Sequence, residues 1–206
     1  MHQTTRDFWN DRYRQKTGET SGKPGLVLSQ FAGPLAPGRA LELGCGRGDD
    51  ALWLARQGWQ VTAVDVSAVA LAYAADSASR AGLAGKVRFE EHDLAETFPE
   101  GMYDLVVASF LQSPRDWPRA RVLARAAGAV STGGHLLITE HASHPPGSKA
   151  TEDTIFPTAE ETLASLALDP RQWRRLCVCA IARMGTRDEV QGETVEDNVI
   201  FLERLG

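Results

Sequence analysis

The chain alternates short apolar runs with stretches of helical periodicity, and this alternation restricts its fold more than any other feature of the sequence. Five apolar runs bounded by turn residues occur at 39–44, 60–65, 86–93, 103–110 and 135–141. Helix-like stretches fill most of the gaps, at 49–58, 67–82 and 118–130. This order predicts a parallel sheet that is covered by helices on both faces.

The pattern changes after residue 141. A loop rich in Pro, Gly and Ser leads to a short helix-like stretch at 158–167, and two further β-rich runs follow at 173–184 and 198–205. Because only a polar segment separates the last two runs, we expect them to pair antiparallel. The predicted fold class is therefore α/β: a Rossmann-like, doubly wound, mostly parallel seven-stranded sheet with a C-terminal antiparallel strand pair.

The length of 206 residues suits a single domain. We expect residues 1–206 to form one domain, with the Rossmann-like core at 38–206. Residues 1–30 precede the first strand, so we expect them to lie over one end of the sheet as a cover or lid.

The stretch "LELGCGRGDD" carries glycines at Gly44, Gly46 and Gly48. Such glycines allow positive φ and a close backbone approach, so that N–H groups of the loop can face a negatively charged group of a ligand. A phosphate-binding P-loop would continue with Lys and then Ser or Thr, but Asp49 and Asp50 follow. Asp49 also stands where a dinucleotide fingerprint needs its third glycine. Both acids suit a helix N-terminus and would attract a ligand ammonium group.

Carboxylates follow the first three predicted strands. Asp65 comes 21 residues after Gly44, the separation at which an acid accepts hydrogen bonds from ribose hydroxyls. Asp93 ends the third run, where its carboxylate or the neighbouring backbone could contact an adenine amino group. With Glu42 they fall at the carboxyl ends of strands, where open parallel sheets bind ligands. The pattern predicts a nucleoside ligand without a 2′-phosphate.

The segments "LELGCGRG", "VTAVDVS", "FEEHDLAE" and "YDLVVASFLQ" together resemble the successive motifs of the class I S-adenosylmethionine-dependent methyltransferases. The resemblance implies S-adenosyl-L-methionine as the cofactor and S-adenosyl-L-homocysteine as its product. In that family the glycine loop contacts the methionine moiety, the acid after the second strand binds the ribose, and the acid after the third lies by the adenine. The stretches "FWNDRYRQKTG" and "GGHLLITEHA" are similar to the thiopurine and tellurite-resistance group of small-substrate methyltransferases. Where that group tends to have His after the fourth strand, this chain has Gln112.

These observations lead to a set of predicted site residues. The predicted cofactor contacts are Trp9, Glu42, Gly44, Cys45, Gly46, Gly48, Asp65, Val66, Ser67, Asp93, Leu94 and Ser109. Gln112 and His141 are the predicted catalytic residues, and no metal site is predicted. On the acceptor side we also expect Phe110 and His144, with Trp9, Tyr13 and Trp117 closing an aromatic pocket that favours a sulfonium through cation–π contact.

Structural interpretations of the same residues stay open. Asp65 could cap the following helix, and Asp93 could form a turn. Trp9 and Tyr13 share one face of a predicted N-terminal helix and could form its docking face. A loop histidine such as His141 is commonly just solvated.

Composition limits the partners. The net charge of −5 argues against nucleic acid as the main partner, because nonspecific binding to it depends on clustered Lys and Arg. The sequence has no apolar run approaching the roughly 18 residues needed to cross a bilayer, and its first residues lack an apolar signal core. We expect a cytoplasmic protein with a small-molecule methyl acceptor, no nucleic-acid partner and no membrane contact. The oligomeric state is left open.

The chain has three cysteines, Cys45, Cys177 and Cys179. An odd number without C-x-x-C spacing indicates neither a disulfide framework nor a zinc ribbon, so we expect free thiols. Cys177 and Cys179 fall on the same face of a predicted strand and are interpreted as core residues. Cys45 lies in the glycine loop, where a small side chain is required.

Three functions are compatible with this sequence. The leading hypothesis is an enzyme that transfers a methyl group by in-line displacement to a small nucleophile, such as a thiol or a metalloid anion. A soft anion of this kind needs no strong general base. The alternatives are a protein that binds the cofactor without transferring its methyl group, and a nicotinamide oxidoreductase, which Asp49 in place of glycine disfavours.

Overall fold

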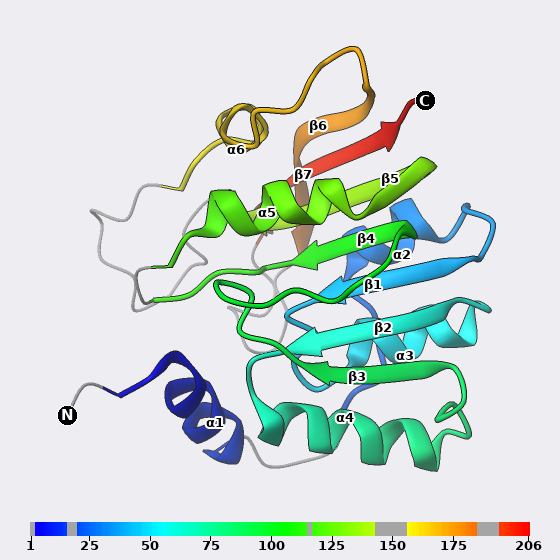
Figure 1. Cartoon of the computed structure of the whole chain (residues 1–206), viewed down its shortest axis with the longest axis vertical. Helices are drawn as coiled ribbons and strands as arrows, with labels where there is room; N and C mark the ends of the chain where they lie inside the picture. The colour runs from blue at the N-terminus through cyan, green and yellow to red at the C-terminus, as the bar shows by residue number, and fades with distance from the viewer. Residues whose placement is uncertain (1–2, 16–19, 115–116, 143–155, 185–193) are drawn as a thin grey trace.

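The chain folds around one seven-stranded sheet with the strand order β3-β2-β1-β4-β5-β7-β6 (Figure 1). The computed structural model describes residues 3–15, 20–114, 117–142, 156–184 and 194–206. The strands are β1 (Arg39–Leu43), β2 (Gln60–Asp65), β3 (Val87–Glu91), β4 (Tyr103–Ser109), β5 (Val130–His141), β6 (Trp173–Met184) and β7 (Thr194–Arg204). The neighbours among β1 to β5 pair parallel, whereas β7 runs antiparallel to both β5 and β6. The predicted fold class is confirmed.

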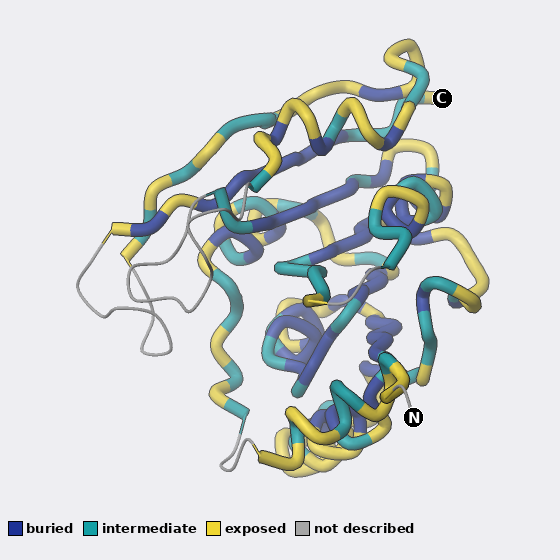
Figure 2. Tube along the Cα trace, turned by 90° about the vertical axis from the view of Figure 1, so that its left-hand side faces the viewer, coloured by how far each residue is buried: buried dark blue, intermediate teal, exposed yellow. Residues whose placement is uncertain are grey.

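Helices cover both faces of the sheet. The helices are α1 (Thr5–Gln15), α2 (Leu26–Ala32), α3 (Asp49–Arg56), α4 (Ala68–Arg80), α5 (Arg119–Gly128) and α6 (Ala159–Ser165). Apolar side chains of α2, α3 and α4 join one buried cluster, and those of α5 and α6 join a second cluster across the sheet. Figure 2 shows the buried strands between these outer layers. Among the described residues, no helix is both long and apolar enough to cross a membrane.

The helix boundaries follow the capping signals in the sequence. Gly48, with φ of 84°, precedes α3, and Gly58 and Gly82 follow α3 and α4 with φ of 101° and 70°. These left-handed conformations are cheap only for glycine. Ser67 caps α4 by accepting the N–H of Ala70 at 3.2 Å. The predicted starts of α3 and α4 are thereby confirmed to within a residue.

Two segments differ from the prediction. The strand expected at 135–141 already begins at Val130, and α5 ends at Gly128 instead of running to residue 130. The pairing between β4 and β5 shifts between Tyr103 and Leu105. A bulge of this kind lets a strand continue through the glycines at 133 and 134. Because glycines commonly mark turns, the predicted strand started only after them. The sequence also gave no prediction for α2.

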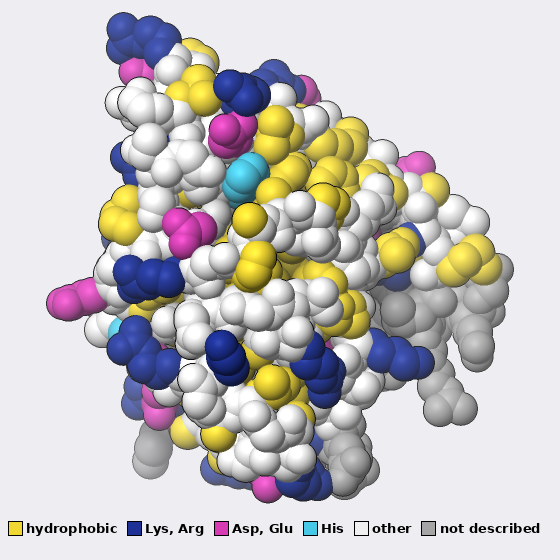
Figure 3. Space-filling model, turned by 90° about the vertical axis from the view of Figure 1, so that its right-hand side faces the viewer, with side chains coloured by type: hydrophobic (Ala, Val, Ile, Leu, Met, Phe, Trp, Pro, Cys, Tyr) yellow, Lys and Arg dark blue, Asp and Glu magenta, His cyan; other side chains and the backbone are white. Residues whose placement is uncertain are grey.

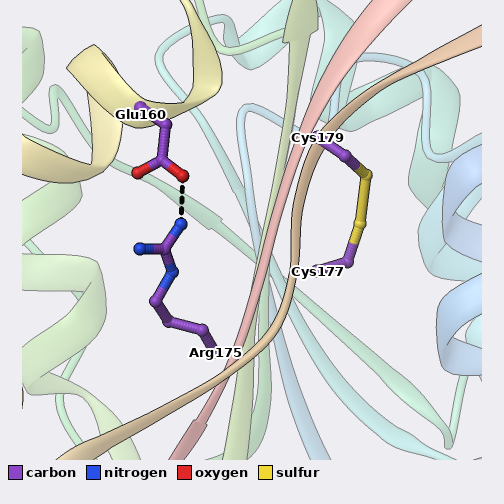
Figure 4. Close-up of a disulfide and its surroundings, with 4 residues drawn as sticks. All are labelled: Glu160, Arg175, Cys177 and Cys179. Atoms are coloured by element: carbon purple, nitrogen blue, oxygen red, sulfur yellow. Dashed lines mark hydrogen bonds and ion pairs between the residues drawn. A yellow bond between two sulfur atoms is a disulfide. The ribbon is translucent and has the colours of Figure 1, made fainter.

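The expectation of three free thiols is wrong for one pair. Cys177 and Cys179 form a disulfide on the edge strand β6, as Figure 4 shows, and only Cys45 is a free, buried thiol. The prediction that both lie on one face is correct, and they pack against the core while half-buried. That placement brings their Cα atoms to 6.0 Å, within the range that a disulfide bridges.

Candidate cofactor and acceptor site

The lining residues place a pocket at the carboxyl ends of the parallel strands. Figure 1 shows these strand ends on its left-hand side, with α1 below them. Helix α1, the loops that follow β1, β2 and β3, and the loop between β4 and α5 all contribute to the pocket. The lining residues are Thr5, Trp9, Tyr13, Gly44, Asp65, Val66, His92, Asp93, Leu94, Phe110, Leu111, Gln112, Ser113 and Trp117. The strand-end placement predicted from the sequence is therefore where the structure has its pocket.

The glycine loop is held tightly by backbone hydrogen bonds. The N–H groups of Gly44 and Cys45 both donate to the carbonyl of Val64, at 2.8 and 2.9 Å. Gly44 has φ of 71°, and a Cβ there would lie 2.6 Å from the side chain of Leu111. A Cβ on Gly46 would lie 2.8 Å from the hydroxyl of Tyr13. Glycine is required at these two positions because the neighbouring side chains leave no room for a Cβ. The lack of a side chain would also let a ligand approach the backbone of the loop.

Asp65 both braces the loop and faces the pocket. Its Oδ2 accepts the N–H of Gly46 at 2.9 Å, and its Oδ1 accepts the N–H of Ser67 at 2.8 Å. Burial raises the pKa of Asp65, and the two backbone N–H groups partly offset that rise. Each carboxylate oxygen keeps a further lone pair for a ligand hydroxyl. The structural and the ligand-binding interpretations of Asp65 are thus compatible.

Four other predicted cofactor contacts do not line the pocket in this conformation. Ser67 is fully buried, caps α4 and donates its hydroxyl to Asn10 at 2.8 Å, and it does not line the pocket. Ser109 hydrogen-bonds to Asp50 beneath the loop. Cys45 and Gly48 also lie behind the pocket wall. We expect these four residues to shape the site through the backbone.

A buried carboxyl group lies beneath the glycine loop. Glu42 is 3% exposed, and its Oε2 has no hydrogen-bond partner among the described residues. Burial raises the pKa of Glu42 well above its ordinary range, and the charges of Asp50, Asp65 and Asp49 raise it further. A positive group bound at the loop would compensate this acidic cluster. Glu42 therefore fits a ligand that carries an ammonium or sulfonium charge.

Asp49 and Asp50 have a role that the sequence did not reveal. Asp49 Oδ1 accepts the hydroxyl of Ser21 at 2.8 Å and also the N–H of Gly22, and Asp50 Oδ1 accepts the N–H of Gly25 at 2.7 Å. Neither acid lines the pocket. The expectation that they attract a ligand ammonium directly is corrected, because their carboxylates anchor the segment before α2.

Helix α1 closes the side of the pocket. The Oδ1 of Asn10 accepts the Ser67 hydroxyl at 2.8 Å and the N–H of Val69 at 3.3 Å, which fixes α1 to the start of α4. Trp9 and Tyr13 then face the pocket. Burial, followed by the charge of Asp65, raises the pKa of Tyr13, so its hydroxyl stays neutral. Helix α1 thus lies beside the pocket, and a cover formed by the whole of residues 1–30 stays a prediction.

The loop after β3 forms another wall. Asp93 shapes the turn, since its Oδ1 accepts the N–H of Ala95 at 3.1 Å and its carbonyl accepts the N–H of Thr97 at 2.7 Å. Asp93 nevertheless lines the pocket together with Leu94 and, after β2, Val66. These three predicted residues are brought together.

The acceptor end of the pocket is formed after β4. Phe110 has φ of 50°, a conformation that costs a non-glycine residue about 1–3 kcal/mol and that clusters at functional sites. Gln112 lines the pocket as predicted. Arg119 fixes this loop, because its Nε donates to the carbonyl of Leu111 at 2.9 Å and its Nη2 contacts the fully buried Glu140 at 2.6 Å. The loop that carries Gln112 is therefore rigidly positioned.

His141 lies just behind this wall. Its ring contacts that of Phe110 with centroids 4.6 Å apart, while His141 itself does not line the pocket. His144 lies outside the described residues. Four lining residues were not predicted from the sequence: Thr5, His92, Leu111 and Ser113. The sequence signal for them is their position, since Thr5 lies one helical turn before Trp9 and the other three are next to predicted residues.

The charge of the pocket decides between the candidate ligands. The described lining residues include two aspartates, Asp65 and Asp93, and neither lysine nor arginine. A dinucleotide pyrophosphate would meet this wall without a cation, whereas a nucleoside with a sulfonium and an ammonium group would be attracted to it. Within the described ranges, no three His, Cys, Asp or Glu side chains are grouped so as to hold a metal ion.

Comparison with known proteins agrees with this geometry. Residues 40–134, which include the glycine loop and both pocket aspartates, match the family model described as "Methyltransferase domain". This segment is thus similar to methyltransferase domains over just under half of the chain. The match supports S-adenosylmethionine as the cofactor and the predicted enzyme class.

Individual proteins show the same similarity over different lengths. The chain is 36% identical over 114 residues to "Ribosomal RNA small subunit methyltransferase C" of Alcanivorax borkumensis, a match that covers 53% of this chain but only 34% of that relative. The chain thus spans about a third of the length of this curated relative.

Two solved structures share the fold over almost the whole chain. One, from the work "Conversion of a Disulfide Bond into a Thioacetal Group during Echinomycin Biosynthesis", has a TM-score of 0.72 at 23% identity and covers 98% of this chain and 93% of its own. TehB from Haemophilus influenzae has a TM-score of 0.66 at 18% identity, and covers 98% and 67%. At these identities the likeness establishes the fold alone.

Proposed function

We propose that the methyltransferase domain makes this chain an S-adenosylmethionine-dependent methyltransferase acting on a small nucleophile. The observation that carries the proposal is the pocket itself: an acidic, cation-free wall at Asp65 and Asp93 that continues into an aromatic end at Phe110 and Trp117. One end suits the cofactor and the other suits an uncharged or soft acceptor.

The chain's own residues would hold the cofactor in three places. The glycine loop, with Gly44 on the pocket wall, would receive the methionine part, whose ammonium charge offsets the buried Glu42. Asp65 would accept hydrogen bonds from the ribose, and Asp93 with Leu94 would contact the adenine. Bound there, the cofactor supplies an electrophilic methyl group.

Trp9 and Tyr13 would exclude water from the reacting centre, because α1 holds their rings over the pocket. The β4–α5 loop would orient the acceptor, since Arg119 and Glu140 fix its backbone. Holding two reactants in near-attack geometry can supply on the order of 7 kcal/mol, so positioning alone accounts for much of the catalysis of such a transfer. Gln112 is the polar side chain at this end that would face the acceptor.

A small acceptor is favoured over nucleic acid by charge and by shape. The net charge is −5. On the face opposite the pocket, shown in Figure 3, Lys and Arg side chains are scattered and do not form one basic patch. The relative named as a ribosomal RNA methyltransferase is matched over only 34% of its length.

Calorimetric titration with S-adenosylmethionine, S-adenosylhomocysteine and NADH tests the cofactor assignment on the wild type and on Asp65→Ala. We expect micromolar binding of both adenosyl ligands, about −8 kcal/mol, and no binding of NADH. Removing a charged hydrogen-bond acceptor should weaken adenosyl binding by at least about 30-fold, or roughly 2 kcal/mol. Failure of the folded wild type to bind either adenosyl ligand would refute the proposal.

Asp104→Ala is the matched control. Asp104 is the second residue of β4, at the amino end of the strand and away from the pocket, and its Oδ2 accepts the N–H of Arg39 at 2.8 Å, so it is a structural acid. The Asp104→Ala variant should be less stable than the wild type but bind the cofactor with the same affinity. A screen for S-adenosylhomocysteine formation with thiols, phenols, amines, metalloid oxyanions and ribosomal RNA then identifies the acceptor class. Cofactor binding without turnover of any of these would favour a silent binding protein.

A further inference from the structure

Three side chains form a row across the strands β5, β7 and β6 beside the acceptor end of the pocket. His141 on β5 is directly opposite Asp197 on β7, and Asp197 is opposite Ile181 on β6. Arg183 stands two residues beyond Ile181, and therefore on the same face of the sheet as Asp197. The sheet register thus places a histidine, an aspartate and an arginine side by side.

The contacts within this row are close and shielded from water. Nδ1 of His141 lies 3.7 Å from Oδ1 of Asp197, whose side chain is only 1% exposed. Arg183 binds both oxygens of Asp197, Nε to Oδ2 and Nη2 to Oδ1, the latter at 3.2 Å. This two-point contact fixes the orientation of the Asp197 carboxylate.

The aromatic rings around His141 define which of its nitrogens is available. The ring of Phe110 stacks on the imidazole at 4.6 Å, and that of Phe156 meets it edge-on at 6.4 Å. Nδ1 is directed at Asp197, which leaves Nε2 as the nitrogen not engaged by the carboxylate. Because Phe110 also lines the pocket, His141 is one ring away from the acceptor end.

We propose that Asp197, fixed by Arg183, is a positioning residue that holds His141 with Nδ1 protonated and Nε2 free to accept a proton from the methyl acceptor. The proposal rests on the proposed methyltransferase function. When an acceptor X–H is methylated, the X–C bond forms, the C–S bond breaks with its electron pair left on sulfur, and the proton of X–H passes to Nε2 of His141. Asp197 then stabilises the resulting imidazolium, for which a 3.7 Å separation is an ion-pair distance.

The inference extends the sequence-based hypothesis, in which a soft anion needs no base. A thiol or phenol that is still protonated at neutral pH would benefit from the row, whereas an acceptor that is already ionised would not. The structure thus assigns the acceptor class as one that includes protonated nucleophiles.

The first test needs no acceptor. Long-range proton–nitrogen NMR of the wild type identifies the tautomer of His141, and His141→Gln assigns its signal. We expect the Nδ1–H tautomer in the wild type and its loss in Asp197→Asn. An Nε2–H tautomer in the wild type would overturn the proposal, whether or not the chain is a methyltransferase.

The second test compares kcat for 2-mercaptoethanol, mostly protonated at pH 7, with kcat for thiophenol, mostly ionised. Asp197→Asn should lower kcat for the first at least about 10-fold, with KM unchanged, and leave the second within about 2-fold. In a His141→Gln background, Asp197→Asn should have no further effect on kcat. Equal losses for both thiols, or additive losses in the double variant, would show a merely structural role.

Two further variants keep this test decisive. If Asp197→Asn, which removes the carboxylate bound by Arg183, fails to fold, the double variant Arg183→Met with Asp197→Asn removes both charges and should show the same selective loss. Asp169→Asn is the matched control, because it breaks an exposed Asp–Arg pair with Arg171 in the turn before β6, and it should change neither kcat. If the wild type methylates neither thiol nor any other acceptor, the proposed function is refuted. The tautomer measurement still tests whether Asp197 positions His141.

Discussion

Glu42 leads to a prediction about stability that runs against the usual response of proteins to acid. Its carboxyl group is buried, Oε2 has no partner among the described residues, and three other acids raise its pKa further. In the unfolded chain Glu42 would return to its ordinary pKa of 4.5. Between that value and the raised native pKa, the native state holds a proton that the unfolded state has released.

The sign of the pH dependence follows from this difference. Where the native state binds one more proton than the unfolded state, the free energy of unfolding falls by about 1.4 kcal/mol for each unit of rising pH. Glu42→Gln removes that contribution. Relative to the wild type, the variant should therefore gain up to about 2.7 kcal/mol between pH 5 and pH 7, as long as pH stays below the native pKa.

Urea unfolding of the cofactor-free protein at pH 5, 6, 7 and 8 measures this difference. The wild type should be less stable relative to Glu42→Gln at each higher pH, and S-adenosylhomocysteine should reduce the gap. Glu100→Gln changes an exposed glutamate and should run parallel to the wild type. Parallel pH dependence of the wild type and Glu42→Gln would refute the assignment of a neutral, buried carboxyl beneath the loop.

Three other substitutions test the packing of the fold and of the site. Gly48→Ala should destabilise the fold by about 2–4 kcal/mol in urea unfolding, because φ is 84° and the new Cβ would lie 2.9 Å from that of Ala74. Gly82→Ala, at φ of 70° but with nothing within 4 Å, should cost only about 1–2 kcal/mol, and equal costs would show that crowding is irrelevant. Asn10→Ala should remove two hydrogen bonds from α1, one of them to Ser67, and make α1 faster to cleave in limited proteolysis and weaken S-adenosylhomocysteine binding by about 10-fold. An unchanged cleavage rate would mean that α1 is held by other contacts.

Most of the fold could be predicted from the sequence because the relevant signals are local. Apolar runs gave the strands, while Ser67, Gly58 and Gly82 marked where helices begin and end. The continuation of β5 to Val130 could not be seen, since it depends on a bulge in pairing with β4. The disulfide between two cysteines of one strand also depends on backbone positions that the residue pattern does not fix.

That three residues of the pocket would meet was predictable for the same reason. Gly44, Asp65 and Asp93 each come at the end of one strand of successive strand–helix units. Their spacing in the sequence therefore predicts that they lie close together at one end of the sheet. The anchoring role of Asp49 and Asp50 was hidden, because their partners lie about 25 residues earlier in the chain. The row from His141 to Arg183 could not be predicted, because it depends on the pairing register of strands that are far apart in the sequence.

The position of β7 has a consequence for synthesis of the chain. Although β7 follows every other strand in sequence, it lies between β5 and β6 in the sheet. A ribosome adding about 5–20 residues per second therefore exposes β5 with one side unpaired, and β6 with no partner at all, until residues 194–204 emerge. The strands β1 to β5 can assemble before β7 is made, but the Asp197 row can form only after residues 194–204 have emerged. We expect the acceptor side of the site to be the last part of the sheet to fold in a nascent chain.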